Sequence, residues 1–153
     1  MATLDKNSWH FTALMKGSDG LDILSRSYCV RQGTANLLTV RFSNEECAHI
    51  LIDCGAFDQN QYYLQAVDQI VAATGGIFSD IIISHTDEDH ISGILKMAQS
   101  GQLKRADHVY IGGTPMNANI SDWTVQSRFS RKMRLLLETL IKKKSVLKMR
   151  SGL

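Results

Sequence analysis

Short segments rich in apolar and β-branched residues, separated by polar turns, occupy the first third of the chain. Segments of this kind are typical of β-strands. They predict four strands before Asp53, over residues 9–15, 21–30, 37–42 and 49–52. The turns expected between them lie at the glycine-flanked residues 17–20 and the polar residues 43–46. We therefore expect an antiparallel meander at the start of the chain.

The apolar spacing changes to a helical period after residue 60. Apolar positions three and four residues apart predict a helix over 61–73 and a shorter one over about 91–99, which ends near Gly101. Between them, Ile81 to Ile83 form an apolar run that is too short for a helix and reads as a buried strand. A further strand is expected over 108–111. Strands linked by helices indicate an α/β protein with layered helices and strands.

The C-terminal region predicts a basic amphipathic helix at about 124–148. Its apolar residues fall at helical spacing, and they are Phe129, Met133, Leu136, Leu137, Leu140 and Ile141. Residues 1–127 carry a net charge of −6, whereas residues 128–153 carry +8. The candidate contacts to nucleic-acid phosphates are Lys142, Lys143 and Lys144. The alternative is the solvated face of a helix, and we favour it because no aromatic residues interleave with these lysines.

Length and cysteine content limit the class of protein. The 153 residues are enough for one domain with a hydrophobic core. Three cysteines at uneven spacing indicate neither a disulfide framework nor a structural zinc site, which favours a reducing, cytoplasmic setting. We expect no secretion signal and no contact with a membrane, because no apolar run approaches the length of a membrane span.

Four residues of metal-binding type follow the isoleucine run: His85, Asp87, Asp89 and His90. In an extended chain, residues two apart face the same way, so His85 and Asp87 can converge on one ion. Asp89 and His90 lie where a helix begins, and the side chains of adjacent helical residues point about 100° apart around the helix axis. These two could therefore bind two neighbouring ions or different sides of one site. Mixed imidazole and carboxylate ligands suit zinc, manganese or iron. The alternative is a polar loop in which Asp87 or Asp89 caps the helix.

Residues 84–93 read S-H-T-D-E-D-H-I-S-G, and here the sequence resembles the metallo-β-lactamase fold superfamily. The usual signature of that superfamily is H-x-H-x-D-H, and Asp87 replaces its second histidine. This departure is similar to the soluble domain of bacterial competence DNA-uptake channel proteins. Residues 30–38, V-R-Q-G-T-A-N-L-L, and 50–55, I-L-I-D-C-G, resemble two further motifs of that subgroup. The resemblance spans about residues 22–112.

The resemblance implies the first half of an αββα sandwich and a metal-dependent hydrolase. It implies two zinc or manganese ions, the first held by His85 and Asp87 and the second by Asp89 and His90. A metal-activated water would attack the substrate, with Asp89 orienting that water and later protonating the leaving group. Asp53 would orient the metal-binding loop without binding an ion. The subgroup favours phosphodiester substrates, and nucleic acid in particular.

In this superfamily, later parts of the fold supply the remaining ligands. We therefore expect these 153 residues alone to be a weak hydrolase or inactive. A completing half, a partner chain or a second copy would cover the open sheet. One alternative is a truncated or non-catalytic metal-binding or interaction module of the same fold. The other is a structural metal protein in which four ligands close around one ion.

Overall fold

The computed structural model describes residues 2–4, 10–17, 20–58, 60–112, 131–142 and 146–149. The strands in this part of the chain are β1 (Ala2–Leu4), β2 (His10–Lys16), β3 (Asp22–Tyr28), β4 (Gly33–Arg41), β5 (Cys47–Ala56), β6 (Ile77–Ile83), β7 (Arg105–Ile111) and β8 (Val146–Met149). The helices described are α1 (Gln61–Thr74), α2 (Glu88–Gln99) and α4 (Arg131–Lys142). None of these helices is both long and apolar enough to cross a lipid bilayer.

All the described strands form one mixed sheet, in which their spatial order follows the order of the sequence. Strands β1 to β5 pair antiparallel, whereas β5 to β8 pair parallel. The predicted antiparallel meander before Asp53 is therefore confirmed as strands β2 to β5. The predicted isoleucine strand is also confirmed, as the end of β6.

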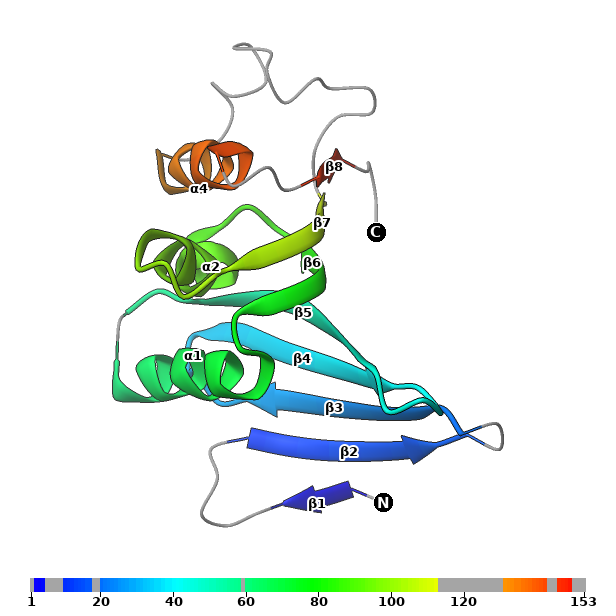
Figure 1. Cartoon of the computed structure of the whole chain (residues 1–153). Helices are drawn as coiled ribbons and strands as arrows, with labels where there is room; N and C mark the ends of the chain where they lie inside the picture. The colour runs from blue at the N-terminus through cyan, green and yellow to red at the C-terminus, as the bar shows by residue number, and fades with distance from the viewer. Residues whose placement is uncertain are drawn as a thin grey trace.

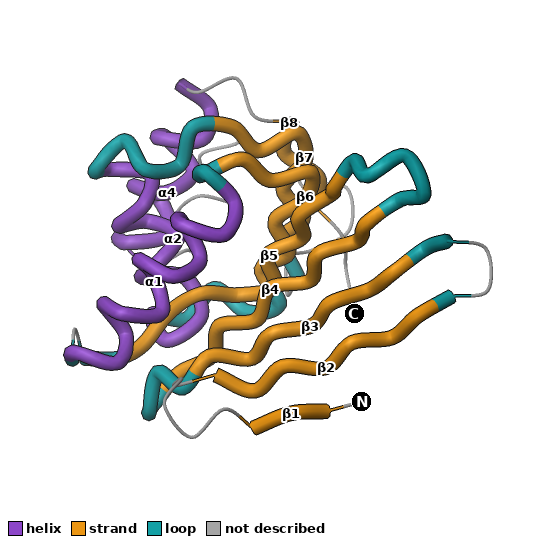
Figure 2. Tube along the Cα trace, turned by 60° about the horizontal axis from the view of Figure 1, so that its bottom comes forward, coloured by secondary structure: helices purple, strands orange, loops and turns teal. Residues whose placement is uncertain are grey.

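The described helices cover one face of the sheet and leave the other face without a helix (Figures 1 and 2). In the sequence, helix α1 connects β5 to β6, α2 connects β6 to β7, and α4 follows β7 and precedes β8. Crossovers between parallel strands normally share one hand, so strands added in one direction place their helices on the same face. The result is a mixed α/β arrangement with one helical layer and one sheet layer, and this confirms the predicted α/β class.

The hydrophobic core lies between these two layers. Residues Leu37, Leu51, Ile81 and Val109 occupy matching register positions on four neighbouring strands, and each is fully buried. Helix α2 packs against β5 and β4 of this group and contributes residues such as Ile94 to the same core. Burial of one such side chain contributes about 1.5–3 kcal/mol. The core therefore fixes α2 over the middle of the sheet.

Local signals define both ends of α1. The side-chain oxygen of Asn60 accepts a hydrogen bond from the backbone N–H of Tyr63 at 3.0 Å, which caps the first turn. Gly75 ends the helix with a φ of 63°, a conformation that glycine adopts without strain. The predicted helix over 61–73 is confirmed, and it extends to Thr74.

The C-terminal helix is amphipathic, as predicted, but it is shorter than predicted. Its buried side is formed by Met133, Leu136, Leu137 and Leu140. Ile141 is 48% exposed and lies off this stripe. The predicted extension to residue 148 is wrong, because Val146–Met149 forms β8 and pairs with β7. Strand pairing satisfies backbone groups that the edge of β7 would otherwise leave free. Residues 124–130, which include Phe129, and residues 143–145 lie outside the described part.

Candidate metal-binding site

The carboxyl ends of β5, β6 and β7 meet at one edge of the sheet, and the candidate loop begins there. Ile52 on β5 is in register with Ile82 on β6, and Ile83 is in register with Ile111 on β7. Residues 84–87 leave β6 at this edge and lead into α2. Loops at the carboxyl ends of parallel strands are the usual place for ligand sites in α/β sheets.

Asp53 lies on a β-bulge at the same edge. In the pairing of β4 with β5, Ala35 opposes Cys54 and Asn36 opposes Ile52, so Asp53 has no partner in the register. Its φ is 52°, in the left-handed region that a residue other than glycine seldom adopts. Bulges of this kind redirect a side chain next to a site. Here the bulge lets a buried carboxylate, 4% exposed, reach the loop after β6.

The Asp53 carboxylate holds both ends of the candidate loop. One oxygen, Oδ1, accepts from the backbone N–H of Ser84 at 2.8 Å, while Oδ2 accepts from Ser84 Oγ at 2.5 Å. Oδ2 also lies 3.0 Å from His90 Nδ1. A carboxylate oxygen accepts hydrogen bonds, so this contact favours the His90 tautomer that donates from Nδ1, in which Nε2 carries the electron pair. This is the arrangement commonly found for histidine ligands of metal ions.

The other predicted ligands lie at different distances from His90. Asp89 Oδ2 is 3.7 Å from His90 Nε2, and the ring of His85 meets the ring of His90 edge to face at 5.5 Å. His85 and Asp87 are exposed. Within the described ranges, no group of three or more His, Cys, Asp or Glu side chains is positioned to hold a metal ion. The two-ion arrangement of the four residues remains a prediction.

Asp87, one of the two residues that the alternative interpretation named as a helix cap, does not cap α2 with its side chain. It occupies the N-cap position of α2, yet its side chain makes no capping hydrogen bond. Only its backbone carbonyl takes part, by accepting from the N–H of His90 at 3.0 Å. The Asp87 carboxylate is therefore available for another role. Imidazole and carboxylate donors of this kind are the types that bind zinc or manganese, so the donor types suit the implied ions, whereas their spacing in the structure does not form a closed ligand group.

Two glycines allow α2 to lie directly against the end of β5. A Cβ atom on Gly55 would come within 2.7 Å of the carbonyl oxygen of Glu88 and of the carbonyl carbon of Asp89. A Cβ atom on Gly93 would lie 2.5 Å from the sulfur of Cys54. Real Cβ atoms do not come this close to their neighbours. The first turn of α2, which carries two predicted ligands, is thus positioned by backbone packing.

Ser92 joins the same two elements by hydrogen bonds, and the sequence analysis did not identify it. Its hydroxyl accepts from the backbone N–H of Ala56 at 2.9 Å and donates to the carbonyl of Ala56 at 3.0 Å. Ser84, which binds Asp53, was likewise given no role. Both serines lie within the motif over 84–93, and their positions there are the signal that could have identified them.

Burial keeps two ionisable side chains near this junction neutral. It raises the pKa of the Cys54 thiol to about 12, and the neighbouring Asp53 adds to the effect. Burial also raises the pKa of the Tyr63 hydroxyl to about 12. A protonated thiol is a poor nucleophile and a poor metal ligand. We therefore assign Cys54 to packing and not to chemistry.

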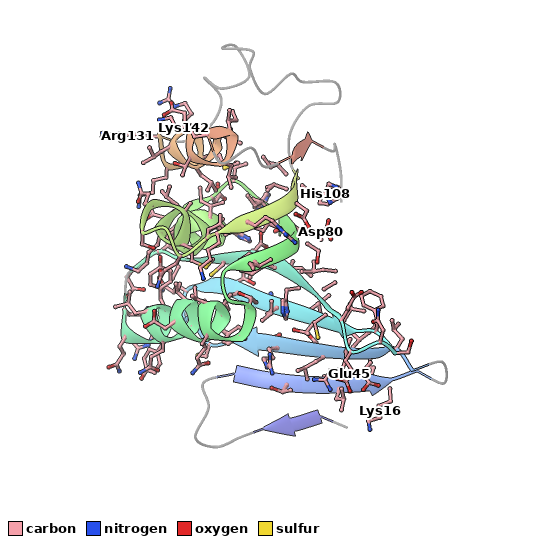
Figure 3. The ribbon with its side chains drawn as sticks, in the orientation of Figure 1. Lys16, Glu45, Asp80, His108, Arg131 and Lys142 are labelled. Atoms are coloured by element: carbon pink, nitrogen blue, oxygen red, sulfur yellow. The ribbon has the colours of Figure 1, made fainter. Side chains whose placement is uncertain are left out.

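Two further histidines, His49 and His108, lie on strands of the sheet and not in the loop. His108 pairs with Asp80 at 3.3 Å across β6 and β7, on the side of the sheet away from the helices (Figure 3). His49 Nδ1 lies 3.1 Å from Thr39 Oγ1. Burial, with a contribution from Arg26, lowers the pKa of His49. Each of these two rings thus has a partner at Nδ1 within the sheet.

Of the three lysines predicted to contact nucleic acid, only Lys142 is described. It is the last residue of α4, and Arg131 is the first; both are exposed (Figure 3). Lys143 and Lys144 lie outside the described residues. Nucleic-acid binding by this cluster remains a prediction.

The chain was compared with known proteins. No model of a known protein family matches it. No curated protein matches it with significant similarity. The assignment of its site therefore depends on the geometry described above.

Proposed function

We propose that this chain is a metal-dependent hydrolase whose site is the loop between β6 and α2. The observation that carries the proposal is the hydrogen bond from His90 Nδ1 to Asp53, which leaves His90 Nε2 as an electron-pair donor. The one-sided layering of helices on a mixed sheet supports a half-sandwich of the metallo-β-lactamase type. The motif over residues 84–93 supports the same class of fold.

The proposed roles are those that the resemblance of residues 84–93 implies. A bound zinc or manganese ion makes hydroxide available near neutral pH and polarises the scissile group. His85 and Asp87 would hold one ion, and Asp89 and His90 would hold the other. Asp89, in the first turn of α2, also orients the attacking water and returns a proton to the leaving group. Asp53 keeps His90 in the required tautomer.

For the substrate we propose a phosphodiester, and nucleic acid in particular. The support is the Asp at position 87, which makes the motif similar to the competence-protein subgroup. The basic surface of α4, with Arg131, Lys132 and Lys142 exposed, supplies charge of the sign that attracts phosphates. A non-catalytic metal-binding module of the same fold is the alternative.

Metal binding is the first test. Purified wild-type chain is loaded with zinc or manganese and dialysed, and its metal content is measured by mass spectrometry. We expect bound metal in the wild type and its loss in a His85→Ala, His90→Ala double variant. The matched control is His108→Ala, which removes an exposed histidine from the other side of the sheet. Equal metal content in the double variant and wild type, with both folded by circular dichroism, would contradict the proposal.

Turnover is the second test, and it separates a hydrolase from a binding module. The metal-loaded chain is incubated with bis(p-nitrophenyl) phosphate and with a single-stranded oligonucleotide. Cleavage that Asp89→Asn lowers by about a hundredfold or more supports the catalytic role. Because these 153 residues alone are expected to be weakly active or inactive, the assay is read at high enzyme concentration, and cleavage unaffected by Asp89→Asn would contradict the catalytic role of Asp89.

A further inference from the structure

Phe57 and Arg31 lie at the sheet edge that carries the candidate metal-binding loop. Phe57 directly follows Ala56, whose backbone N–H and carbonyl are both hydrogen-bonded to Ser92 on α2. The backbone N–H of Phe57 donates to the carbonyl of Gln32 at 3.1 Å, which joins it to the loop that carries Arg31. The backbone of both residues is therefore fixed next to the helix whose first turn holds two of the proposed ligands.

Both residues offer their side chains to a ligand. Phe57 is 59% exposed, although a large aromatic side chain gains stability from burial. Arg31 is exposed, and its guanidinium lies over the ring of Tyr62, 4.6 Å from the ring centroid, which positions the charge without neutralising it. Within the described part of the chain, Arg31 forms no ion pair with a carboxylate. Its φ of 65° is one that residues other than glycine seldom adopt outside functional sites.

We infer that Phe57 and Arg31 bind one unpaired nucleotide of the substrate, Phe57 by stacking on the base and Arg31 by binding an adjacent phosphate. The inference rests on the proposed function, because it assigns substrate-binding residues to the same site. Proteins that hold single strands combine aromatic side chains that stack on bases with cationic groups that bind phosphates. In a duplex the faces of the bases are covered by their neighbours, so an exposed phenylalanine selects a single strand.

The acidic residues near this edge do not rule out a phosphate at Arg31. Asp87 and Asp89 are proposed metal ligands, and bound cations would offset their charge. Glu88 is paired with a lysine of α4. Asp58 accepts a hydrogen bond from a neighbouring asparagine side chain at 2.6 Å. An acidic peptide could also meet Arg31, but a nucleic acid in addition brings its phosphodiester to the proposed metal site, and this favours the nucleotide.

The probe for the test is a fluorescein-labelled oligothymidylate of about twelve nucleotides, and its binding to the full chain in the presence of zinc is measured by fluorescence anisotropy. We expect Phe57→Ala to weaken binding about tenfold, the usual effect of losing one stacked base. Phe57→Trp should retain the affinity, whereas Phe57→Leu, which keeps an apolar side chain without an aromatic ring, should not. Arg31→Gln should lower the slope of log affinity against log salt by about 0.7, the value for one phosphate contact to a single strand.

The matched controls come from the opposite end of β4. Phe42→Ala and Arg41→Gln make the same chemical changes at an exposed phenylalanine and an exposed arginine away from the candidate loop, and both should leave the affinity and its salt dependence unchanged. A duplex that contains the same strand should bind more weakly than the strand alone. Circular dichroism checks that every variant is folded.

Four results would overturn the inference. They are no binding of the strand, equal losses in the site and control variants, tighter binding of the duplex than of the single strand, and tighter binding of a peptide rich in glutamate and phenylalanine. Failure of the proposed function gives a different result, because the strand would then bind through Phe57 and Arg31 to a chain that retains no metal after dialysis.

Discussion

Asp53 is the residue on which the candidate site depends. It is buried, it has a left-handed backbone, and it binds both Ser84 and His90. Holding a residue in this backbone conformation costs of order 1–3 kcal/mol of folding free energy, and such strain is concentrated at functional sites. The hydrogen bonds of the carboxylate offset that cost and place the imidazole of His90.

Replacing Asp53 with asparagine should weaken metal binding without removing a ligand. The new side-chain amide would face His90 Nδ1 or Ser84 and favour the wrong imidazole tautomer. We expect zinc affinity to fall by about 10- to 100-fold, the usual effect of losing such a partner. Competition with a zinc-binding dye measures this change. Asp80→Asn, which affects the pair with His108, is the control, and equal affinities in the two variants would contradict the role of Asp53.

The buried Cys54 and Tyr63 make the fold sensitive to alkaline pH. The folded state raises the pKa of Cys54 from 9.0 to about 12 and that of Tyr63 from 10.0 to about 12. Both groups therefore bind protons more tightly when the chain is folded. Their contribution to stability is complete below pH 9 and is lost as the pH rises toward 12.

We expect the free energy of unfolding to fall steadily between pH 9 and pH 12. Urea unfolding followed by circular dichroism at several pH values measures the trend. Tyr63→Phe should flatten the part of the curve above pH 10, because it removes one ionisable group. An unfolding free energy that is constant across this range would show that neither group is shifted as described.

At the scale of secondary structure, the junction of α2 with β5 positions the first turn of α2. Gly55 and Gly93 permit close approach, and Ser92 links α2 to Ala56 on β5. The alignment of α2 with the sheet edge thus depends on small residues. Substitutions there should affect the site at a distance.

Gly93→Ala compares two opposing effects on stability: the higher helix propensity of alanine and the steric clash that its Cβ would make at this junction. Alanine in the middle of a helix is favoured over glycine by about 1 kcal/mol. The new Cβ, however, would lie 2.5 Å from the Cys54 sulfur and 2.8 Å from the Cys54 carbonyl oxygen. Overpacking typically costs about 1–3 kcal/mol, so we expect a net loss of stability and of metal affinity. Urea unfolding measures the stability, with Gln99→Ala at the exposed end of α2 as the control.

At the scale of the whole molecule, the sheet has one face without a described helix (Figure 2). Ile50, Ile52 and Ile82 are partly exposed on that face, beside Asp80 and His108. Apolar sheet faces are normally covered by a second layer. A partner chain, a completing half or a second copy would supply such a layer. When the chain is purified alone, a second copy of the same chain is the available cover.

We therefore expect the purified chain to self-associate in a concentration-dependent manner. Replacing Ile82 with lysine should shift it to monomers, because a charge would be buried in the interface. Ile77→Lys is the control, since Ile77 is exposed at the start of the same strand. Sedimentation velocity measures the distribution. A wild-type chain that stays monomeric at every concentration, or equal effects of the two variants, would contradict this expectation.

The sequence determined those features whose causes are local. The isoleucines of β6 identified a strand, and the apolar spacing over residues 61–73 identified α1, because side-chain periodicity acts within a few residues. The four candidate ligands lie within six consecutive residues and were visible for the same reason. Their grouping around ions is still a prediction.

The tertiary structure decided those features that join distant segments. The bulge at Asp53 and its contact with His90, 37 residues away, depend on which strand ends meet at the sheet edge. Tertiary structure also set the end of the C-terminal helix. Residues Val146–Met149 pair alongside β7 and do not continue the helix. Long-range pairing can outweigh local helical preference, because backbone groups at a strand edge gain hydrogen bonds only from a partner that the fold brings to them.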